Sequence, residues 1–97
     1  MLKNNKLKTS KQMERHFKGI SNHKRIEILL MVDKNKDLSL DEIDENLKGN
    51  FRTTSEHTRR LSEAGLLNKK YSGRRVLHSL SPYGKVFVKF IKTFQHS

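Results

Sequence analysis

The apolar side chains in the first third of the chain recur with helical spacing. Met13, Phe17 and Ile20 stand at i, i+4 and i+7, which predicts the inward stripe of a helix. This helix spans residues 9–19, because the glycine at its end weakens a helix. Residues 23–34, HKRIEILLMVDK, are apolar through their middle and therefore predict the central helix of the core.

Helix-capping signals divide the rest of the helical sequence. Ser39 and Glu42 form an S-x-x-E capping box, in which each side chain bonds the backbone N–H of the other residue. They follow a short strand that Leu38 begins, and they start a third helix with the inward stripe Leu40, Ile43 and Leu47. The other predicted N-caps are Ser21 or Asn22 for the second helix, Asn50 or Thr53 for the fourth, and Ser81 before Pro82 for the last.

A fourth helix over residues 51–65 follows the third after the turn KGN, in which Gly49 is free to take a positive φ. Its inward stripe is thin and consists of Thr54, Thr58, Leu61 and Ala64. Two short helices joined by a tight turn form a helix-turn-helix, whose second helix can enter the DNA major groove.

Two alternating runs then predict a β-hairpin over residues 66–71 and 74–80, joined at Ser72-Gly73, where Gly73 supplies a positive φ. The final helix covers residues 82–97. The element order is therefore α-α-β-α-α-β-β-α, a mainly α fold with a small β-hairpin. A chain of 97 residues is too short to bury a second core, so this order describes one domain.

Charge changes this picture because it is segregated along the chain. The formal net charge is +11, which attracts polyanions, nucleic acid first and anionic membrane second. Residues 1–25 hold eight Lys or Arg and one acid, and residues 48–75 hold eight and two. Residues 26–47 hold two Lys and seven acids. The pattern predicts basic surfaces on either side of an acidic middle.

The cations and short polar side chains of the fourth helix and the hairpin predict a surface for double-stranded DNA. Arginine can bond guanine with two hydrogen bonds or hold phosphates, and a basic hairpin can straddle the backbone beside the groove. The predicted contacts are Arg52, Thr53, Ser55, Glu56, Arg59 and Arg60 on the helix, and Lys69, Lys70, Tyr71, Arg74 and Arg75 on the hairpin.

Two segments, together with the hairpin and the entry to the last helix, resemble the ArsR-type winged helix-turn-helix regulators, with features also found in MarR-type proteins. The first is HFKGISNHKRIEILLMV, in which Phe17, Ile20, Ser21, Asn22, Arg25, Ile26, Ile28 and Leu29 fit the family pattern. The second is TTSEHTRRLSEAGLL, with Thr53, Ser55, His57, Leu61, Ala64, Gly65 and Leu66. The resemblance implies a homodimer that binds an operator and represses transcription, and it adds His57 to the DNA contacts.

The chain departs from the family pattern at four places. Thr54 and Thr58 replace aliphatic residues, so we expect the fourth helix to be loosely anchored. Gly49 replaces an apolar residue in the turn, and Phe51 is expected to compensate by packing inward. Glu56 stands where a cation is common, and it either accepts from cytosine N4 or weakens phosphate binding.

The last helix is too apolar for a helix that packs only on its own domain. Its polar stripe is narrow and consists of Lys85, Lys89 and Lys92. A second apolar face predicts a contact with another copy of the chain, the alternative being a well-buried terminal helix in a monomer. The predicted dimer residues are Met13, Phe17, Tyr83, Phe87, Phe90, Ile91 and Phe94.

Several classes of function lack the residues they need. The chain has no Cys, no glycine-rich phosphate loop and no nucleophile–base pair, so we expect no thiol sensing, no metal, no cofactor and no enzymatic activity. No small-molecule effector is identifiable, and no apolar run reaches membrane-spanning length. We expect residues 1–8 to be a disordered basic arm and residues 9–97 a winged-helix domain ending in the dimerisation helix 82–97. A cytoplasmic, nucleoid-associated location follows.

The leading hypothesis is a sequence-specific homodimeric DNA-binding repressor. One alternative is an architectural or partition-type protein that coats DNA with little base preference, which the high charge and the thin stripe of the fourth helix would suit. Another is a winged-helix module that binds a protein partner through its acidic middle. The ratio of specific to random DNA affinity separates the first two, and absence of duplex binding favours the third.

Overall fold

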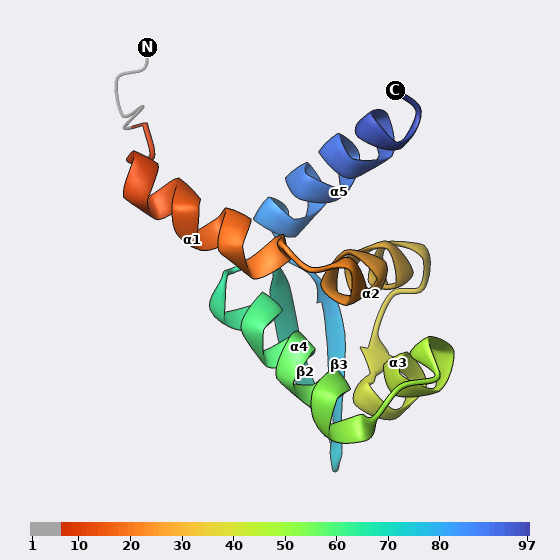
Figure 1. The fold of residues 1–97 in the computed structure, drawn as a ribbon. Coiled ribbons are helices and arrows are strands. Elements are labelled where there is room, and N and C mark those ends of the chain that lie inside the picture. Colours follow the sequence, from red (N-terminus) through yellow and green to blue (C-terminus); the bar gives the residue numbers. More distant parts are fainter. Residues whose placement is uncertain (1–6) are drawn as a thin grey trace.

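The computed structural model describes residues 7–97, so most of the predicted basic arm, residues 1–6, lies outside the described part. The elements follow the predicted order, and the mainly α winged helix-turn-helix fold is confirmed (Figure 1). The elements are α1 (Ser10–Ile20), α2 (His23–Lys34), β1 (Leu38–Ser39), α3 (Leu40–Leu47), α4 (Phe51–Glu63), β2 (Leu67–Ser72), β3 (Arg75–Leu80) and α5 (Pro82–Gln95).

Side-chain caps set the helix boundaries where the sequence signals stand. Ser39 and Glu42 form the predicted box at the start of α3. Of the alternative N-cap residues, Asn22 caps α2 and Asn50 caps α4. The side chain of each accepts a hydrogen bond from a backbone N–H of the first turn. Helix α1 has a capping box that the sequence analysis did not identify, because its N3 residue is Gln12 rather than the more familiar Glu.

Two turns differ from the prediction by one residue. The hairpin turn is Gly73-Arg74 rather than Ser72-Gly73, so Gly73, with φ of 62°, is the first turn residue, as a type II′ turn requires. The residue with positive φ between α3 and α4 is Lys48, with φ of 54°, and not Gly49. Helix α3 ends on this left-handed residue, whose N–H bonds the carbonyl of Asp44.

The three strands form an antiparallel sheet in the order β1-β3-β2. Residue 38 pairs with residue 78, which joins the short strand before α3 to the hairpin. In the hairpin, Lys69 pairs with His78, Tyr71 with Val76, and Ser72 with Arg75. Figure 1 shows the hairpin tip at one end of the molecule, while α1 and α5 project from the other end.

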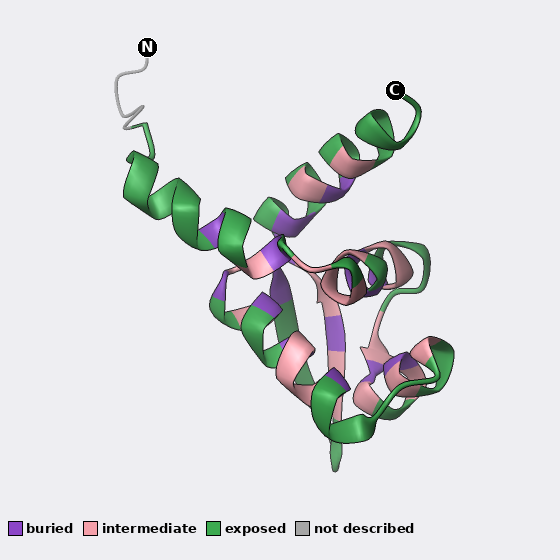
Figure 2. Ribbon diagram, viewed as in Figure 1, coloured by how far each residue is buried: buried purple, intermediate pink, exposed green. Residues whose placement is uncertain are grey.

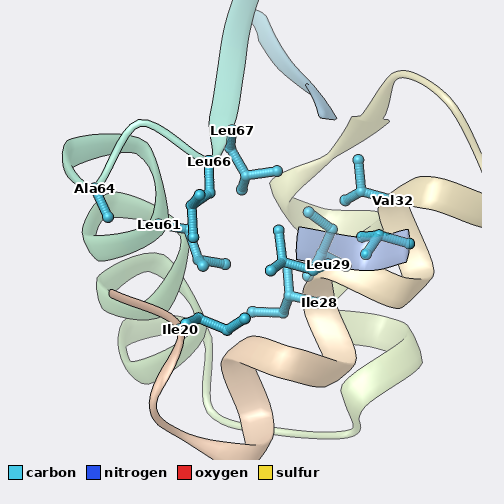
Figure 3. Close-up of a cluster of buried hydrophobic side chains, with 10 residues drawn as sticks. Ile20, Ile28, Leu29, Val32, Leu61, Ala64, Leu66 and Leu67 are labelled. Atoms are coloured by element: carbon cyan, nitrogen blue, oxygen red, sulfur yellow. The ribbon is translucent and has the colours of Figure 1, made fainter. Parts of the chain in front are cut away.

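The core lies where α2, α3, α4, the end of α1 and the middle of α5 meet the base of the hairpin (Figure 3). Ten apolar side chains are buried there: Ile20, Ile28, Leu29, Val32, Ile43, Leu61, Ala64, Leu66, Leu67 and Val88. The predicted stripe of α4 is confirmed, since Thr54, Thr58 and Leu61 are all buried. Figure 2 shows that exposure is greatest on α1, on the hairpin tip and at the end of α5.

The start of α5 docks closely on the chain that follows α4. Ser81 donates its hydroxyl to the Gly65 carbonyl at 2.6 Å and accepts from the Gly84 N–H at 2.9 Å. Gly84 is buried, and a Cβ at this position would collide with the Leu66 carbonyl oxygen. Backbone cannot move aside as the end of a side chain can, so only glycine fits here.

Gly84→Ala should therefore destabilise the protein by about 2 kcal/mol, a typical cost of overpacking. For a domain of this size that lowers the melting temperature by roughly 8–16 °C in a thermal scan. Gly49→Ala is the matched control, because its Cβ would lie 3.5 Å from the nearest atom, the Thr54 hydroxyl oxygen, and its φ is not positive. Equal melting temperatures for the two variants would contradict the close approach of α5.

Candidate nucleic-acid interface

The two threonines in the stripe of α4 are buried and hydrogen-bonded. The Thr54 hydroxyl donates to Asp44 Oδ1 of α3 at 2.6 Å, and the Thr58 hydroxyl donates to the Ser55 carbonyl at 2.9 Å. Only the first of these bonds joins α4 to another element, because Ser55 lies in α4 itself. The loose anchoring of α4 therefore stays a prediction. Phe51 does not compensate by packing inward, because 51% of it is exposed.

A groove of about 360 Å³ runs between α4, the hairpin and the start of α3. Its floor contains Thr58 and His78. The imidazole of His78 bonds the Leu38 carbonyl at 3.0 Å, and burial lowers its pKa. The groove brings together six of the predicted DNA contacts, namely Ser55, Arg59, Lys69, Tyr71, Arg74 and Arg75, and adds Phe51.

The hairpin presents its side chains on two faces. Lys69 and Tyr71 alternate onto the groove side, and Tyr71 is 75% exposed. Lys70 pairs with Leu77 and, by the same alternation, lies on the opposite side. Arg75 is tethered, because its guanidinium donates to Glu42 of α3 at 3.2 Å. The pKa of Glu42 is lowered, mainly because its carboxylate accepts a hydrogen bond from the backbone N–H of Ser39.

The outer face of α4 is an ion-pair network. Glu56 accepts hydrogen bonds from both Arg59 and Arg60, and Arg59 also donates to Glu63 at 2.7 Å. The Arg59 bonds lower the pKa of Glu56, and the two acids raise the pKa of Arg59. The side chains sit at i, i+3 and i+4, the spacing at which helical neighbours touch. Glu56 is thus engaged by two arginines of its own helix.

The remaining predicted contacts on α4 lie outside this groove. His57 Nδ1 accepts from the Arg25 guanidinium at 3.2 Å, and Arg25 Nε donates to the Gly19 carbonyl at 2.7 Å. Burial lowers the pKa of His57, and the nearby Arg25 charge lowers it further. Arg60 lines a separate hollow against α1, beside Arg15 and Lys18. Arg52 and Thr53 are exposed and line neither hollow.

Sequence reasoning missed the basic strip on α1 next to Arg60. Arg15 and Lys18 stand at i and i+3, so they lie on one face of α1. That spacing was the available signal, but only the packing of α1 against α4 brings this face to Arg60. Phe51 was missed as a groove residue because nothing in the sequence distinguishes an exposed phenylalanine from a buried one.

Helices α1 and α5 share an exposed apolar face. Phe17 and Phe87 meet edge to face at 5.3 Å between ring centroids, and with Val86 and Phe90 they line an apolar hollow of about 230 Å³. Phe90 stacks on Phe94 at 5.8 Å. Of the predicted dimer residues, Met13, Phe17, Tyr83, Phe90 and Phe94 are exposed, whereas Phe87 and Ile91 pack partly on the core. Val86, which was not predicted, is 65% exposed.

Residues 7–97 contain no group of three or more His, Asp or Glu side chains placed to hold a metal ion. Within the same residues, no helix has both the length and the hydropathy to cross a bilayer.

No protein-family model matches the chain, and no curated protein matches it. Solved structures do. HlyU from Vibrio cholerae superposes with a TM-score of 0.81 at 26% identity over 100% of both chains. The chain is a winged helix-turn-helix protein. The homodimeric winged helix-turn-helix DNA-binding domain of Mb0332 from Mycobacterium bovis, a possible ArsR-family regulator, has a TM-score of 0.80 at 16% identity, covering 94% of this chain and 90% of that one.

A third neighbour of this winged helix-turn-helix protein is the transcriptional repressor PagR of Bacillus anthracis, with a TM-score of 0.75 at 21% identity over 84% of this chain and 93% of that one. The resemblance to ArsR-type regulators is confirmed at the level of structure. The structural neighbours of this chain are HlyU, a possible ArsR-family regulator and other transcriptional regulators. In the winged helix-turn-helix, α3 and α4 are the helix pair and the β2–β3 hairpin is the wing.

Proposed function

We propose that this protein binds double-stranded DNA as a homodimer and represses transcription at specific operators. The observation that carries the proposal is the groove between α4 and the wing, where Arg59, Lys69 and Arg74 converge from two elements. Such a basic concave surface attracts DNA, with the wing beside the phosphate backbone and the groove side of α4 toward the bases. Regulators with this fold among the structural neighbours support the same function.

The groove suggests how contacts divide between bases and backbone. Arg74 and Lys69 are exposed on the wing and suit phosphates, which fix position without reading sequence. Ser55 and Arg59 face the same groove from α4, where arginine can bond guanine O6 and N7. Arg52, Thr53, Glu56 and Lys70 remain proposed contacts at its margins. His57 then acts by bracing α4 against Arg25.

The apolar face of α1 and α5 supplies the proposed dimer contact. Exposed phenylalanines on two helices gain most by being covered with a matching surface, and a second copy offers the same surface. A two-fold pair places two α4 helices about one DNA turn apart, roughly 34 Å, which fits an inverted repeat. On this proposal the protein works without catalysis, in the cytoplasm and in association with the nucleoid.

Selection of bound duplexes from a random library tests the proposal. The expected product is an enriched inverted repeat with half-sites about 10 base pairs apart. Affinity for it should exceed affinity for random duplexes by at least about a thousandfold at fixed salt. Binding without enrichment would make the protein an architectural DNA-binding protein. Absence of binding at physiological salt would reject DNA as the partner.

Glu56→Gln tests the network on α4. Because Glu56 neutralises two arginines of the proposed DNA surface, its loss should tighten binding to random duplexes about three- to tenfold and steepen the salt dependence. Fluorescence anisotropy over a salt series measures both quantities. Glu27→Gln, which removes the same charge from an exposed position on α2, should change neither. Unchanged binding by Glu56→Gln would mean that α4 does not face DNA.

A further inference from the structure

A second basic hollow, of about 630 Å³, lies at the beginning of α1, against α5. Three cations line it, namely Lys8, Lys11 and Arg15, and no acidic side chain does. Within residues 7–97, none of the three forms an ion pair, although Lys18 on the same helix pairs with Glu14. Three unpaired positive charges around one concavity favour an anion.

A buried imidazole forms one wall of this hollow. His16 is only 5% exposed, and its Nδ1 lies 2.6 Å from the Ala64 carbonyl oxygen. A carbonyl can only accept, so Nδ1 is the donor and carries a proton. This bond fixes the orientation of the ring that lines the hollow. The site therefore has a buried polar group in its wall in addition to its three exposed cations.

The mouth of the hollow is also organised. Lys8 lies with its ammonium 4.2 Å from the centroid of the Tyr83 ring, a cation–π contact that holds the charge near the site. The capping box between Thr9 and Gln12 fixes the chain that carries Lys8. Figure 1 places the start of α1 at the opposite end of the molecule from the wing tip. DNA lying along the wing and α4 would therefore leave this hollow open.

We propose that this hollow binds a small phosphorylated molecule, with its phosphate held by Lys11 and Arg15 beside the wall that His16 forms. A phosphate dianion matches several converging cations better than a single carboxylate does, and arginine bonds it with a two-pronged geometry. The hollow is much larger than a phosphate and lies in the range of small-molecule sites, so an organic part has room beside the Tyr83 ring. The proposal does not rest on the proposed DNA binding.

The same histidine gives the site a connection to α4. Ala64 is the C-cap of α4, and its carbonyl accepts the His16 bond. The amide of Gly65 follows that carbonyl directly, so its NMR resonance reports on the bond.

Titration of the ¹⁵N-labelled full chain with inorganic phosphate, at ionic strength matched with chloride, tests the proposal. We expect saturable shifts of the amides of residues 8–16, Gly65 and Tyr83. The double variant Lys11→Gln/Arg15→Gln should weaken phosphate binding at least about tenfold, because it loses two charge-assisted contacts. The control Lys34→Gln/Lys36→Gln removes the same charge from exposed positions elsewhere and should bind as the unchanged protein does.

Two results would overturn the proposal. Chemical-shift changes that never saturate, or that are equal in the double variant and its control, would mean that phosphate binds only through non-specific charge attraction. A second titration with a short random-sequence DNA duplex distinguishes a DNA phosphate from a small phosphorylated molecule. The duplex should shift only the amide resonances of α4 and the wing. If the duplex instead shifts residues 8–16 and displaces phosphate, the bound group is a DNA phosphate and the small-molecule assignment is wrong. Failure of the duplex to bind at all affects only the proposed function.

Discussion

Replacing Arg74 and Arg75 with alanine is expected to weaken binding to every duplex, whatever its sequence. Both side chains are exposed at the wing tip, where they suit phosphates rather than bases. Each lost phosphate contact lowers the slope of log K against log salt by about 0.9, so the double variant should lose nearly 2 from its slope. At physiological salt we expect affinity to fall about 10- to 100-fold for specific and random duplexes alike.

The two single variants should differ. Arg75 already donates to Glu42, so its contact with DNA replaces an existing ion pair, whereas Arg74 has no ion pair among the described residues. Arg74→Ala should therefore cost more affinity than Arg75→Ala. Lys34→Ala/Lys36→Ala provides the control for a loss of two charges away from the wing. If the double wing variant binds as tightly as this control, the wing does not touch DNA.

The sequence predicted the fold well because its signals are local. Caps, such as Ser39 with Glu42 and Ser81 before Pro82, fix helix starts independently of the rest of the chain. The turn errors have one common cause. A glycine indicates a turn but does not show which turn residue takes the positive φ. In the αL turn after α3, Lys48 takes the positive φ although Gly49 is next to it.

The site was predicted less completely because its decisive contacts join distant segments. The helical pairs of Glu56 with Arg59 and Arg60 could have been read from their spacing. The bond between Arg25 and His57 joins residues 32 positions apart in the sequence, and no helix or strand periodicity predicts it. The family resemblance placed His57 among the DNA contacts, whereas the structure couples it to α2.

These long-range bonds tie the proposed reading helix to α1. His16 of α1 bonds the carbonyl at the end of α4, and Arg25 links the end of α1 at Gly19 to His57 in the middle of α4. Helix α4 is thus held to α1 at two separate points. If α1 and α5 form the dimer contact, the position of each α4 follows from that contact. The spacing of the two half-sites would then be set by the packing of the apolar face.

Phe90→Glu is expected to convert the dimer to monomers. Phe90 is 58% exposed in the single chain and lies in the middle of the apolar face, next to Phe94 and the hollow that Phe17 lines. Its exposure means that the substitution costs the monomer fold little. In a dimer, the two-fold axis would bury two unpaired carboxylates, so we expect dimer dissociation to become at least about a thousandfold more favourable.

Sedimentation velocity measures the mass directly, and Lys89→Gln is the matched control, because it changes the charge by the same amount one position away on the exposed polar stripe. The control should remain dimeric. DNA binding supplies a second measurement: a monomer loses the benefit of two linked half-sites, so affinity for an inverted repeat should fall about 100-fold while affinity for one half-site stays constant. If the Phe90→Glu protein still sediments as a dimer, the dimer interface lies elsewhere. The packing of the α1–α5 face would then not set the spacing of the two half-sites.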